Sequence, residues 1–193
     1  MVKVCILVDD GVEELDFVGV YEVLADVRKV SKHYVDVMVV TFRGKDKVKC
    51  RNGLIIVPHR FMRDFSECRV LVIPGGRDFV ENALSDEELL KAIRRFYEQK
   101  KLIASVCTGS LILAKAGILK GKKATTHHLR MNMLRELGAI PVNKRVVIDD
   151  NVITSGGITA SIDLGLKLVE VLLGEELRNK IAKYIEYHCY REQ

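Results

Sequence analysis

The chain has 193 residues, of which 48% are hydrophobic and 30% carry a charged side chain. This length predicts one domain over residues 1–193, and the composition excludes disordered, collagen-like and repeat-rich fibrous proteins. The longest uncharged stretch, Leu102 to Ala114, is too short to cross a bilayer as a helix. The apolar run from Val4 to Val8 ends too soon for a signal peptide. We therefore expect a cytoplasmic protein with no membrane partner.

The formal net charge is +5 at pH 7, and basic residues cluster at 43–51, 94–95 and 120–123. Acidic residues interrupt most of these clusters, aromatic residues do not alternate with the basic ones, and tryptophan is absent. The stacking surfaces of single-strand binding proteins are therefore missing. We interpret the clusters as solvated faces and expect no nucleic-acid partner.

The chain has five scattered cysteines: Cys5, Cys50, Cys68, Cys107 and Cys189. They form no CxxC pair, so neither a zinc ribbon nor a thioredoxin-like dithiol is indicated. In a reducing cytosol most should be ordinary buried thiols, and the question is whether one of them is reactive.

A strand followed by a helix is the pattern that recurs along the chain. Continuous apolar runs predict buried parallel strands, and apolar residues at helical spacing predict helices between them. The predicted strands cover residues 3–8, 34–42, 69–76 and 102–106, with a hairpin within 45–58. Further strand–helix units follow at 124–128, 131–137, 145–149 and 151–157. The predicted helices cover residues 15–27, 85–101, 159–173 and 175–190, and a short apolar helix begins at Cys107 and ends at Gly117 or Gly121. Ser85 and Glu88 form a capping box that starts the helix 85–101.

This alternation predicts an α/β fold, a three-layer α/β/α sandwich with right-handed crossovers. Ligands of such folds bind at the carboxyl ends of the parallel strands. Three predicted strand ends carry residues suited to chemistry, at 9–16, 74–76 and 106–109. The candidate site is therefore expected at this edge of the sheet.

Cys107 lies where the buried strand 102–106 runs directly into a helix, followed by the small residues Gly109 and Ser110. This arrangement is that of a nucleophile elbow, with cysteine as the nucleophile. The amides and the positive dipole end of the helix N-terminus favour thiolate, and they are expected to lower the pKa of the thiol. The alternative is a small core residue at an apolar junction.

Asp16 follows the first predicted strand and can reach the same edge of the sheet. Beside Cys107 in an apolar pocket its pKa would rise, which suits a proton carrier. The alternative is a carboxylate that only stabilises the start of a helix. Glu13 and Glu14 are interpreted as solvated residues of the first helical turn.

His127 follows a short strand-like segment and is a candidate to orient a substrate or act as a base, while His128 competes with it. The alternative is a hydrogen-bonded structural histidine. Adjacent histidines in an extended segment point to opposite faces, and no metal or other cofactor is expected. The pair Gly75-Gly76 lacks a nucleotide-binding motif, so we interpret it as allowing a backbone N–H near the sulfur. The SGG of 155–157 suggests close packing against the pocket.

Motifs spread over nearly the whole chain resemble those of the ThiJ/PfpI superfamily, relatives of the class I glutamine amidotransferases. They are LVDDGVEELDF, VIPGG, SVCTGSLILAKAGILKGKKATTHH and ITSGGITASIDLGLKLVEVLLG. The resemblance implies a flavodoxin-like sandwich and a homodimer. It also implies that Cys107 is the reactive cysteine, that Asp16 hydrogen-bonds it, and that His127 is the histidine of the TTH motif. The backbone amides of Gly76 and Thr108 are then those around the sulfur.

The resemblance is strongest to the isonitrile hydratase branch, although His128 stands where that branch commonly has tryptophan. Regulators that share this branch carry an additional DNA-binding domain, which we do not expect in a chain of this length. The leading hypothesis is a cysteine-dependent enzyme that hydrates a small electrophilic substrate such as an isonitrile. The alternatives are glyoxalase or deglycase activity on 2-oxoaldehydes, a redox-responsive stress protein, and a PfpI-type peptidase. Thr108 replaces the histidine that directly follows the cysteine in those peptidases.

Overall fold

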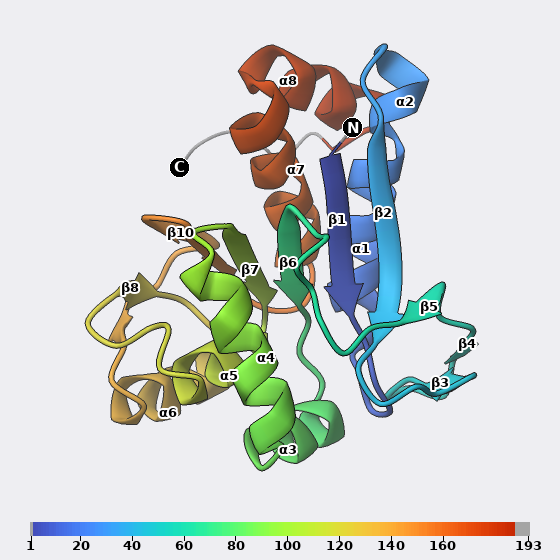
Figure 1. The fold of residues 1–193 in the computed structure, drawn as a ribbon. Helices are drawn as coiled ribbons and strands as arrows, with labels where there is room; N and C mark the ends of the chain where they lie inside the picture. Colours follow the sequence, from blue (N-terminus) through green and yellow to red (C-terminus); the bar gives the residue numbers. More distant parts are fainter. Residues whose placement is uncertain (1, 188–193) are drawn as a thin grey trace.

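The computed structural model describes residues 2–187 as a central seven-stranded sheet with helices on both faces (Figure 1). The strands of this sheet are β1 (Val2–Leu7), β2 (Val35–Thr41), β5 (Arg60–Phe61), β6 (Val70–Ile73), β7 (Leu102–Val106), β10 (Val146–Asp149) and β11 (Val152–Ser155). Their order is β10-β11-β7-β6-β1-β2-β5. All neighbours are parallel except β10 and β11, which are antiparallel. The predicted α/β sandwich with a mostly parallel sheet is confirmed.

The order of the five main parallel strands places the candidate site. In chain order they are β1, β2, β6, β7 and β11, and in space they run 2-1-3-4-5, as in flavodoxin-like folds. The order reverses between β1 and β6, and ligands of such sheets bind at the carboxyl edge near this reversal. The segments after β1, β6 and β7 therefore meet there.

The helices divide between the two faces of the sheet. They are α1 (Glu14–Ala25), α2 (Val27–Val30), α3 (Arg77–Leu84), α4 (Glu87–Glu98), α5 (Gly109–Lys115), η1 (His128–Arg130), α6 (Met131–Glu136), α7 (Ala160–Leu173) and α8 (Glu175–Tyr184). α1 and α7 pack against each other on one face, and α4 and α5 cover the other (Figure 1). A Cβ on Gly19 would lie 2.2 Å from Oγ of Ser161, so the two helices approach closely. This contact fixes α1, which carries Asp16 on its first turn, against α7.

Several predicted elements have different ends in the structure. The hairpin 45–58 is confirmed as β3 (Val48–Lys49) and β4 (Ile55–Ile56), and small strands β8 (Lys123–Ala124) and β9 (Ile140–Pro141) pair beside the main sheet. The capping box is wrong: Asp86 is the N-cap of α4 and accepts from the N–H of Leu89, while Ser85 ends α3. Sequence analysis did not predict α3. α8 ends at Tyr184, and residues 188–190 of its predicted range lie outside the described residues.

The prediction that most cysteines are free thiols is wrong for two of them. Cys5 on β1 and Cys68 before β6 form a disulfide, with Cα atoms 6.0 Å apart across the two neighbouring strands. A separation of 63 residues hid this pairing from the sequence. Cys50 and Cys107 are free and buried, and Cys189 lies outside the described residues.

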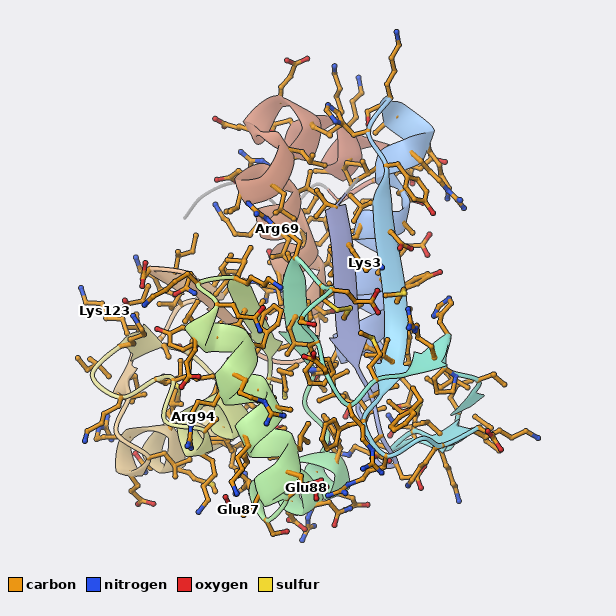
Figure 2. The ribbon with its side chains drawn as sticks, viewed as in Figure 1. Lys3, Arg69, Glu87, Glu88, Arg94 and Lys123 are labelled. Carbon is orange, nitrogen blue, oxygen red and sulfur yellow. A yellow bond between two sulfur atoms is a disulfide. The ribbon has the colours of Figure 1, made fainter. Side chains whose placement is uncertain are left out.

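Charged side chains cover the outer faces of the helices and strands (Figure 2). Lys3 pairs with Glu67 at 2.7 Å, and Arg94 on α4 donates to the carbonyl of Ala116 at 3.0 Å. Between residues 2 and 187, no helix combines the length and apolar character needed to span a membrane. The cytoplasmic location stays a prediction.

Candidate active site

Cys107 lies at a strained turn between β7 and α5. Its φ of +55° is in the left-handed region, which L-residues other than glycine rarely adopt. The N–H of Cys107 donates to the carbonyls of Ser155 and Gly156 at 3.0 and 3.1 Å. Its carbonyl accepts from the hydroxyls of Ser110 and Thr126 at 3.1 and 3.0 Å. These bonds hold the strained conformation, which is the sharp turn that the sequence predicted.

Two glycines let the backbone approach Cys107. A Cβ on Gly109 would lie 2.1 Å from the carbonyl oxygen of Ile73, so α5 begins in direct contact with β6. A Cβ on Gly157 would lie 2.7 Å from Sγ of Cys107 and 2.8 Å from Cδ2 of His127. The packing of the SGG segment against the pocket therefore brings the thiol and the imidazole to the same glycine. Cys107 keeps 6% of its surface exposed.

Asp16, on the first turn of α1, is fully buried. Its Oδ2 accepts the N–H of Gly75 at 2.9 Å, while Oδ1 has no hydrogen-bond partner within residues 2–187. Burial raises the pKa of Asp16 to about 7, and repulsion from Glu13 acts in the same direction. Hydrogen bonds from Gly75 and from the thiol of Cys107 lower it. The direction is the one expected, and it lets Asp16 exchange protons near neutral pH.

The expected low pKa of the Cys107 thiol is wrong. Burial and, after it, the negative charge of Asp16 raise this pKa to about 12, because together they outweigh the N–H and hydroxyl of Thr108, which lower it. The helix N-terminus that favours thiolate is present, but a buried thiol beside a carboxylate loses more than it gains. Burial and the nearby carboxylate therefore favour the protonated thiol over the thiolate in this state. Its proton must pass to Asp16 before or during any nucleophilic attack.

The two predicted backbone amides have different contacts. The N–H of Thr108 and its hydroxyl interact with the sulfur. The N–H of Gly76 donates to that hydroxyl at 3.3 Å, so it supports Thr108 rather than the sulfur in this state. Gly76 has a φ of +120°, and a Cβ there would lie 2.2 Å from the carbonyl oxygen of Gly11. Only glycine fits this position, because the loops after β1 and β6 cross there.

The interpretation of Glu13 as solvated is wrong. Its side chain is 6% exposed; it accepts from Arg51 at 3.0 Å and from Asn52 at 3.1 Å. Both partners come from the turn of the β3–β4 hairpin, and the N–H of Glu13 donates to the carbonyl of Gly75 at 3.0 Å. Glu13 therefore joins this hairpin to the loop that holds Asp16. Glu14 is half-buried and bonds Asn52 as well.

His127 is half-buried beside the thiol. Its Nδ1 accepts the N–H of Leu129 at 3.3 Å, which leaves the proton of the neutral ring on Nε2. Burial lowers the pKa of His127, and the neighbouring His128 and Arg130 act in the same direction, so the ring is neutral at pH 7. The two adjacent histidine rings stack with centroids 4.5 Å apart. They do not point to opposite faces, because η1 begins at His128 and bends the chain.

Three residues make contacts at this site that the sequence did not predict. Gly75 holds Asp16, Thr126 holds the carbonyl of Cys107, and Arg51 pairs with Glu13. The paired glycines after β6 did indicate a backbone N–H donor at Gly75, but we expected this N–H to bond the sulfur rather than Asp16. Nothing in the sequence marked the other two, because their partners lie far along the chain. Over residues 2–187, no three His, Cys, Asp or Glu side chains gather to hold a metal ion.

These features define a mostly parallel α/β sandwich with a buried cysteine and a buried carboxyl group at the carboxyl edge of its sheet. The chain belongs to the DJ-1/PfpI family, whose model matches residues 2–171. The resemblance to the ThiJ/PfpI superfamily is confirmed.

Two relatives and one solved structure show the range of this family. The isonitrile hydratase of Pseudomonas putida is 40% identical over 176 residues, which are 91% of this chain and 74% of the relative. Deglycase TK1284 of Thermococcus kodakarensis is 31% identical over 155 residues, 79% of this chain and 89% of the relative. The crystal structure of Drosophila melanogaster DJ-1beta superposes with a TM-score of 0.87 at 26% identity, covering 96% of this chain and 97% of the other. Enzymes therefore occur among the relatives, with more than one activity.

Proposed function

We propose that this protein is a cysteine-dependent enzyme that hydrates small isonitriles. The observation that carries the proposal is the pairing of a protonated Cys107 thiol with Asp16, whose pKa of about 7 suits transfer of that proton. The isonitrile carbon accepts both a nucleophile and a proton, and this pair supplies both. The similarity to the isonitrile hydratase of Pseudomonas putida supports the same activity.

The proposed reaction has two stages. In the first, Asp16 takes the thiol proton as the sulfur of Cys107 bonds to the terminal carbon of the isonitrile, and the same proton then moves to that carbon. The product is a thioimidate on the enzyme. In the second, water adds to this carbon, the nitrogen takes a proton and the carbon–sulfur bond breaks. An N-substituted formamide leaves and the thiol is restored.

The surrounding groups have roles that follow from their positions. The amide of Thr108 stabilises charge that develops beside the sulfur, and Gly76 orients the Thr108 hydroxyl. His127, neutral with its proton on Nε2, offers a donor near the sulfur, because its ring and the sulfur both lie against Gly157. In this proposal His127 positions the substrate or the water.

The test is formation of the formamide from a small aliphatic isonitrile by purified protein. Cys107→Ser should lower kcat/KM at least about a thousandfold, because the nucleophile is lost. Cys50→Ser, which removes the other free thiol described, should keep the wild-type rate. Full activity of Cys107→Ser would exclude the proposed mechanism.

A second candidate function is deglycase or glyoxalase activity on 2-oxoaldehydes. It is favoured by the position of His127, whose Cδ2 and the sulfur of Cys107 lie against the same glycine. The similarity to deglycase TK1284 supports it as well. Methylglyoxal turnover without isonitrile turnover would decide for this function. A PfpI-type peptidase is less well supported, because Thr108 and not a histidine follows the cysteine.

The non-enzymatic alternative is a redox-responsive stress protein, in which Cys107 is oxidised and Asp16 bonds the product. Mass spectrometry after mild peroxide separates it from the enzymes. Selective oxidation of Cys107 without turnover of any carbonyl or isonitrile substrate would favour the sensor.

We also propose that the protein is a homodimer. Leu15 and Val18 on α1 and Ile55 and Val57 near β4 are exposed apolar residues. Asn52 bonds Glu14, so the hairpin and α1 lie side by side. The mass in solution, with Leu15→Glu as the variant that should give monomers, tests this proposal.

A further inference from the structure

A cavity of about 230 Å³ opens directly beside the candidate site. Gly157, where an added Cβ would lie 2.7 Å from the sulfur of Cys107, forms one of its walls, and Thr126, which bonds the carbonyl of Cys107, forms another. One residue, Gly157, therefore separates this space from the sulfur, so that a substituent of a few bonds on a substrate bonded to the sulfur has to pass Gly157 to reach it. The volume admits a short substituent and is below the range of pockets for drug-sized ligands. We call it the Lys144 cavity.

The Lys144 cavity is lined by basic residues and by no acidic one. Lys144 and Arg145 both contribute to its wall. Arg145 bonds Asp163 and the hydroxyl of Thr159, which fixes its position and compensates its charge. Lys144 is exposed and forms no ion pair in the described part of the chain. One positive charge is therefore left for a ligand.

The backbone also contributes a partial positive charge at the cavity. α7 begins at Ala160, which lines the cavity, and this helix is 14 residues long. The N-terminus of a helix carries a partial positive charge, which favours an anion, although the N–H groups of Ser161 and Ile162 already bond the carbonyls of Ile158 and Thr159. The N-terminus of α7, the side chain of Lys144 and the absence of carboxylates from the lining all favour a negatively charged ligand.

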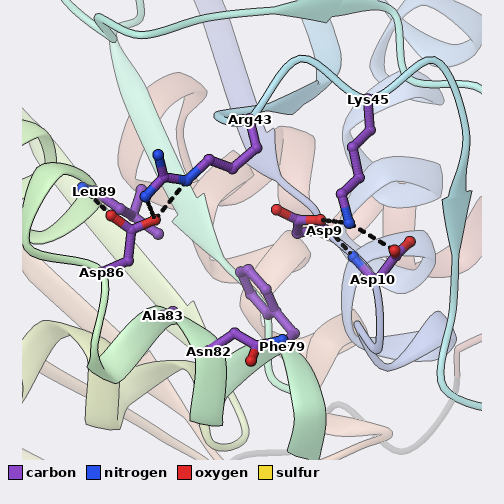
Figure 3. A pocket seen from close by; sticks show the side chains of 9 residues that line it. All are labelled: Asp9, Asp10, Arg43, Lys45, Phe79, Asn82, Ala83, Asp86 and Leu89. Atoms are coloured by element: carbon purple, nitrogen blue, oxygen red, sulfur yellow. Dashed lines mark hydrogen bonds and ion pairs between the residues drawn. The ribbon is translucent and has the colours of Figure 1, made fainter.

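A second cavity, of about 150 Å³, shows the opposite arrangement (Figure 3). Arg43 bonds Asp86 there, and Lys45 bonds both Asp9 and Asp10. Each cation of this cavity already has a carboxylate partner, so it offers no net positive charge. The Lys144 cavity differs in charge and in place, because its walls include Gly157 and Thr126, which pack around Cys107.

We propose that the Lys144 cavity binds a carboxylate group of the substrate, so that the preferred substrates are small electrophiles that carry a carboxylate a few bonds from the reacting carbon. The proposal rests on the proposed function for the chemistry at Cys107. The preference for an anion, however, can be measured without turnover.

The test uses two alkylating probes that differ only in charge, iodoacetylglycine and iodoacetylglycinamide. In both, the sulfur of Cys107 displaces iodide, and only the first places a carboxylate in the cavity. The rate is followed on the Cys107 peptide by mass spectrometry, because Cys50 is also a free thiol. The ratio of the two rates, divided by the same ratio for glutathione, gives the preference for the anion.

We expect this normalised ratio to be about five for the wild type, since one exposed charge contributes up to about 1 kcal/mol. Lys144→Gln should bring it close to one, and Lys144→Glu should bring it below one. Lys91→Glu makes the same change of charge on an exposed face of α4, away from both cavities, and should leave the ratio unchanged. A wild-type ratio of one, or a ratio equally changed by Lys91→Glu, would overturn the proposal.

Turnover then separates this inference from the proposed function. If the protein hydrates isonitriles, KM for a carboxylate-bearing isonitrile should be lower than for its amide, and Lys144→Gln should remove the difference. If no isonitrile reacts while the probe ratio behaves as expected, the proposed function fails and the anion subsite stands. Equal KM values for the two isonitriles would reject the subsite.

Discussion

The N–H of Gly75 donates a 2.9 Å hydrogen bond to Oδ2 of Asp16, and the other carboxyl oxygen of this buried group has no partner in the described chain. The bond fixes the carboxyl at the carboxyl end of β6, beside the turn that carries Cys107. One oxygen is therefore oriented and the other is available to accept a proton. A carboxyl group held in this way suits proton transfer more than helix capping.

The pH dependence of the reaction should follow Asp16. Its pKa is about 7, and the carboxylate form is the one that can accept the thiol proton. We therefore expect kcat/KM, or the alkylation rate of Cys107, to rise as the pH increases from 5 to 8 and then to level off. In Asp16→Asn the rise in rate between pH 5 and 8 should be absent, and the rate at pH 8 should fall by about a hundredfold or more. An unchanged pH profile in that variant would show that another group causes the rise.

The stability of the fold should also depend on the protonation of Asp16, but it should fall, and not rise, as the pH increases. The pKa of Asp16 is about 7 when folded, above its value of 3.8 when free, so the folded state binds the proton more tightly. Stability from this group is complete below pH 4 and is lost as the pH rises through 7. The full difference corresponds to roughly 4 kcal/mol. Urea unfolding should show Asp16→Asn more stable than the wild type at pH 8 and little different at pH 4.

Gly157 should be intolerant of any side chain. In Gly157→Ala the added methyl group would lie 2.7 Å from the sulfur of Cys107, so the turn or the imidazole of His127 must move. We expect at least a tenfold loss of Cys107 reactivity and a destabilisation of about 1–3 kcal/mol. The control is Gly156→Ala, whose new methyl group would meet nothing closer than 3.8 Å. If both variants behave alike, close packing at Gly157 is not the cause.

The disulfide should contribute to stability without taking part in the chemistry. It joins Cys5 and Cys68 across a separation of 63 residues, which restricts the unfolded chain. The double variant Cys5→Ala, Cys68→Ala should lose about 2–5 kcal/mol of unfolding free energy but keep the alkylation rate of Cys107. A reductant should destabilise the wild type and have no effect on the double variant. Equal stability with and without reductant would contradict this prediction.

Several features followed from local sequence alone. Buried parallel strands are continuous apolar runs, so β1, β2, β6 and β7 and the class of fold were predictable to within a few residues. The turn at Cys107 was predictable too, because an apolar strand meets a helix there with only small residues behind the cysteine. Helix ends were less certain, since the choice between Ser85 and Asp86 as a cap depends on the α3 helix that precedes them.

The sequence by itself determined the sheet, the strand-to-helix turn and the residue types at its edge, because these depend on neighbours along the chain. Only the tertiary structure decided the charge states. The thiol is protonated and Glu13 is buried because residues distant in sequence remove water and supply charges around them. The disulfide and the Lys144 cavity arise in the same way, from segments that the fold brings together. Solvation and long-range proximity are properties of the packed chain, and no local pattern records them.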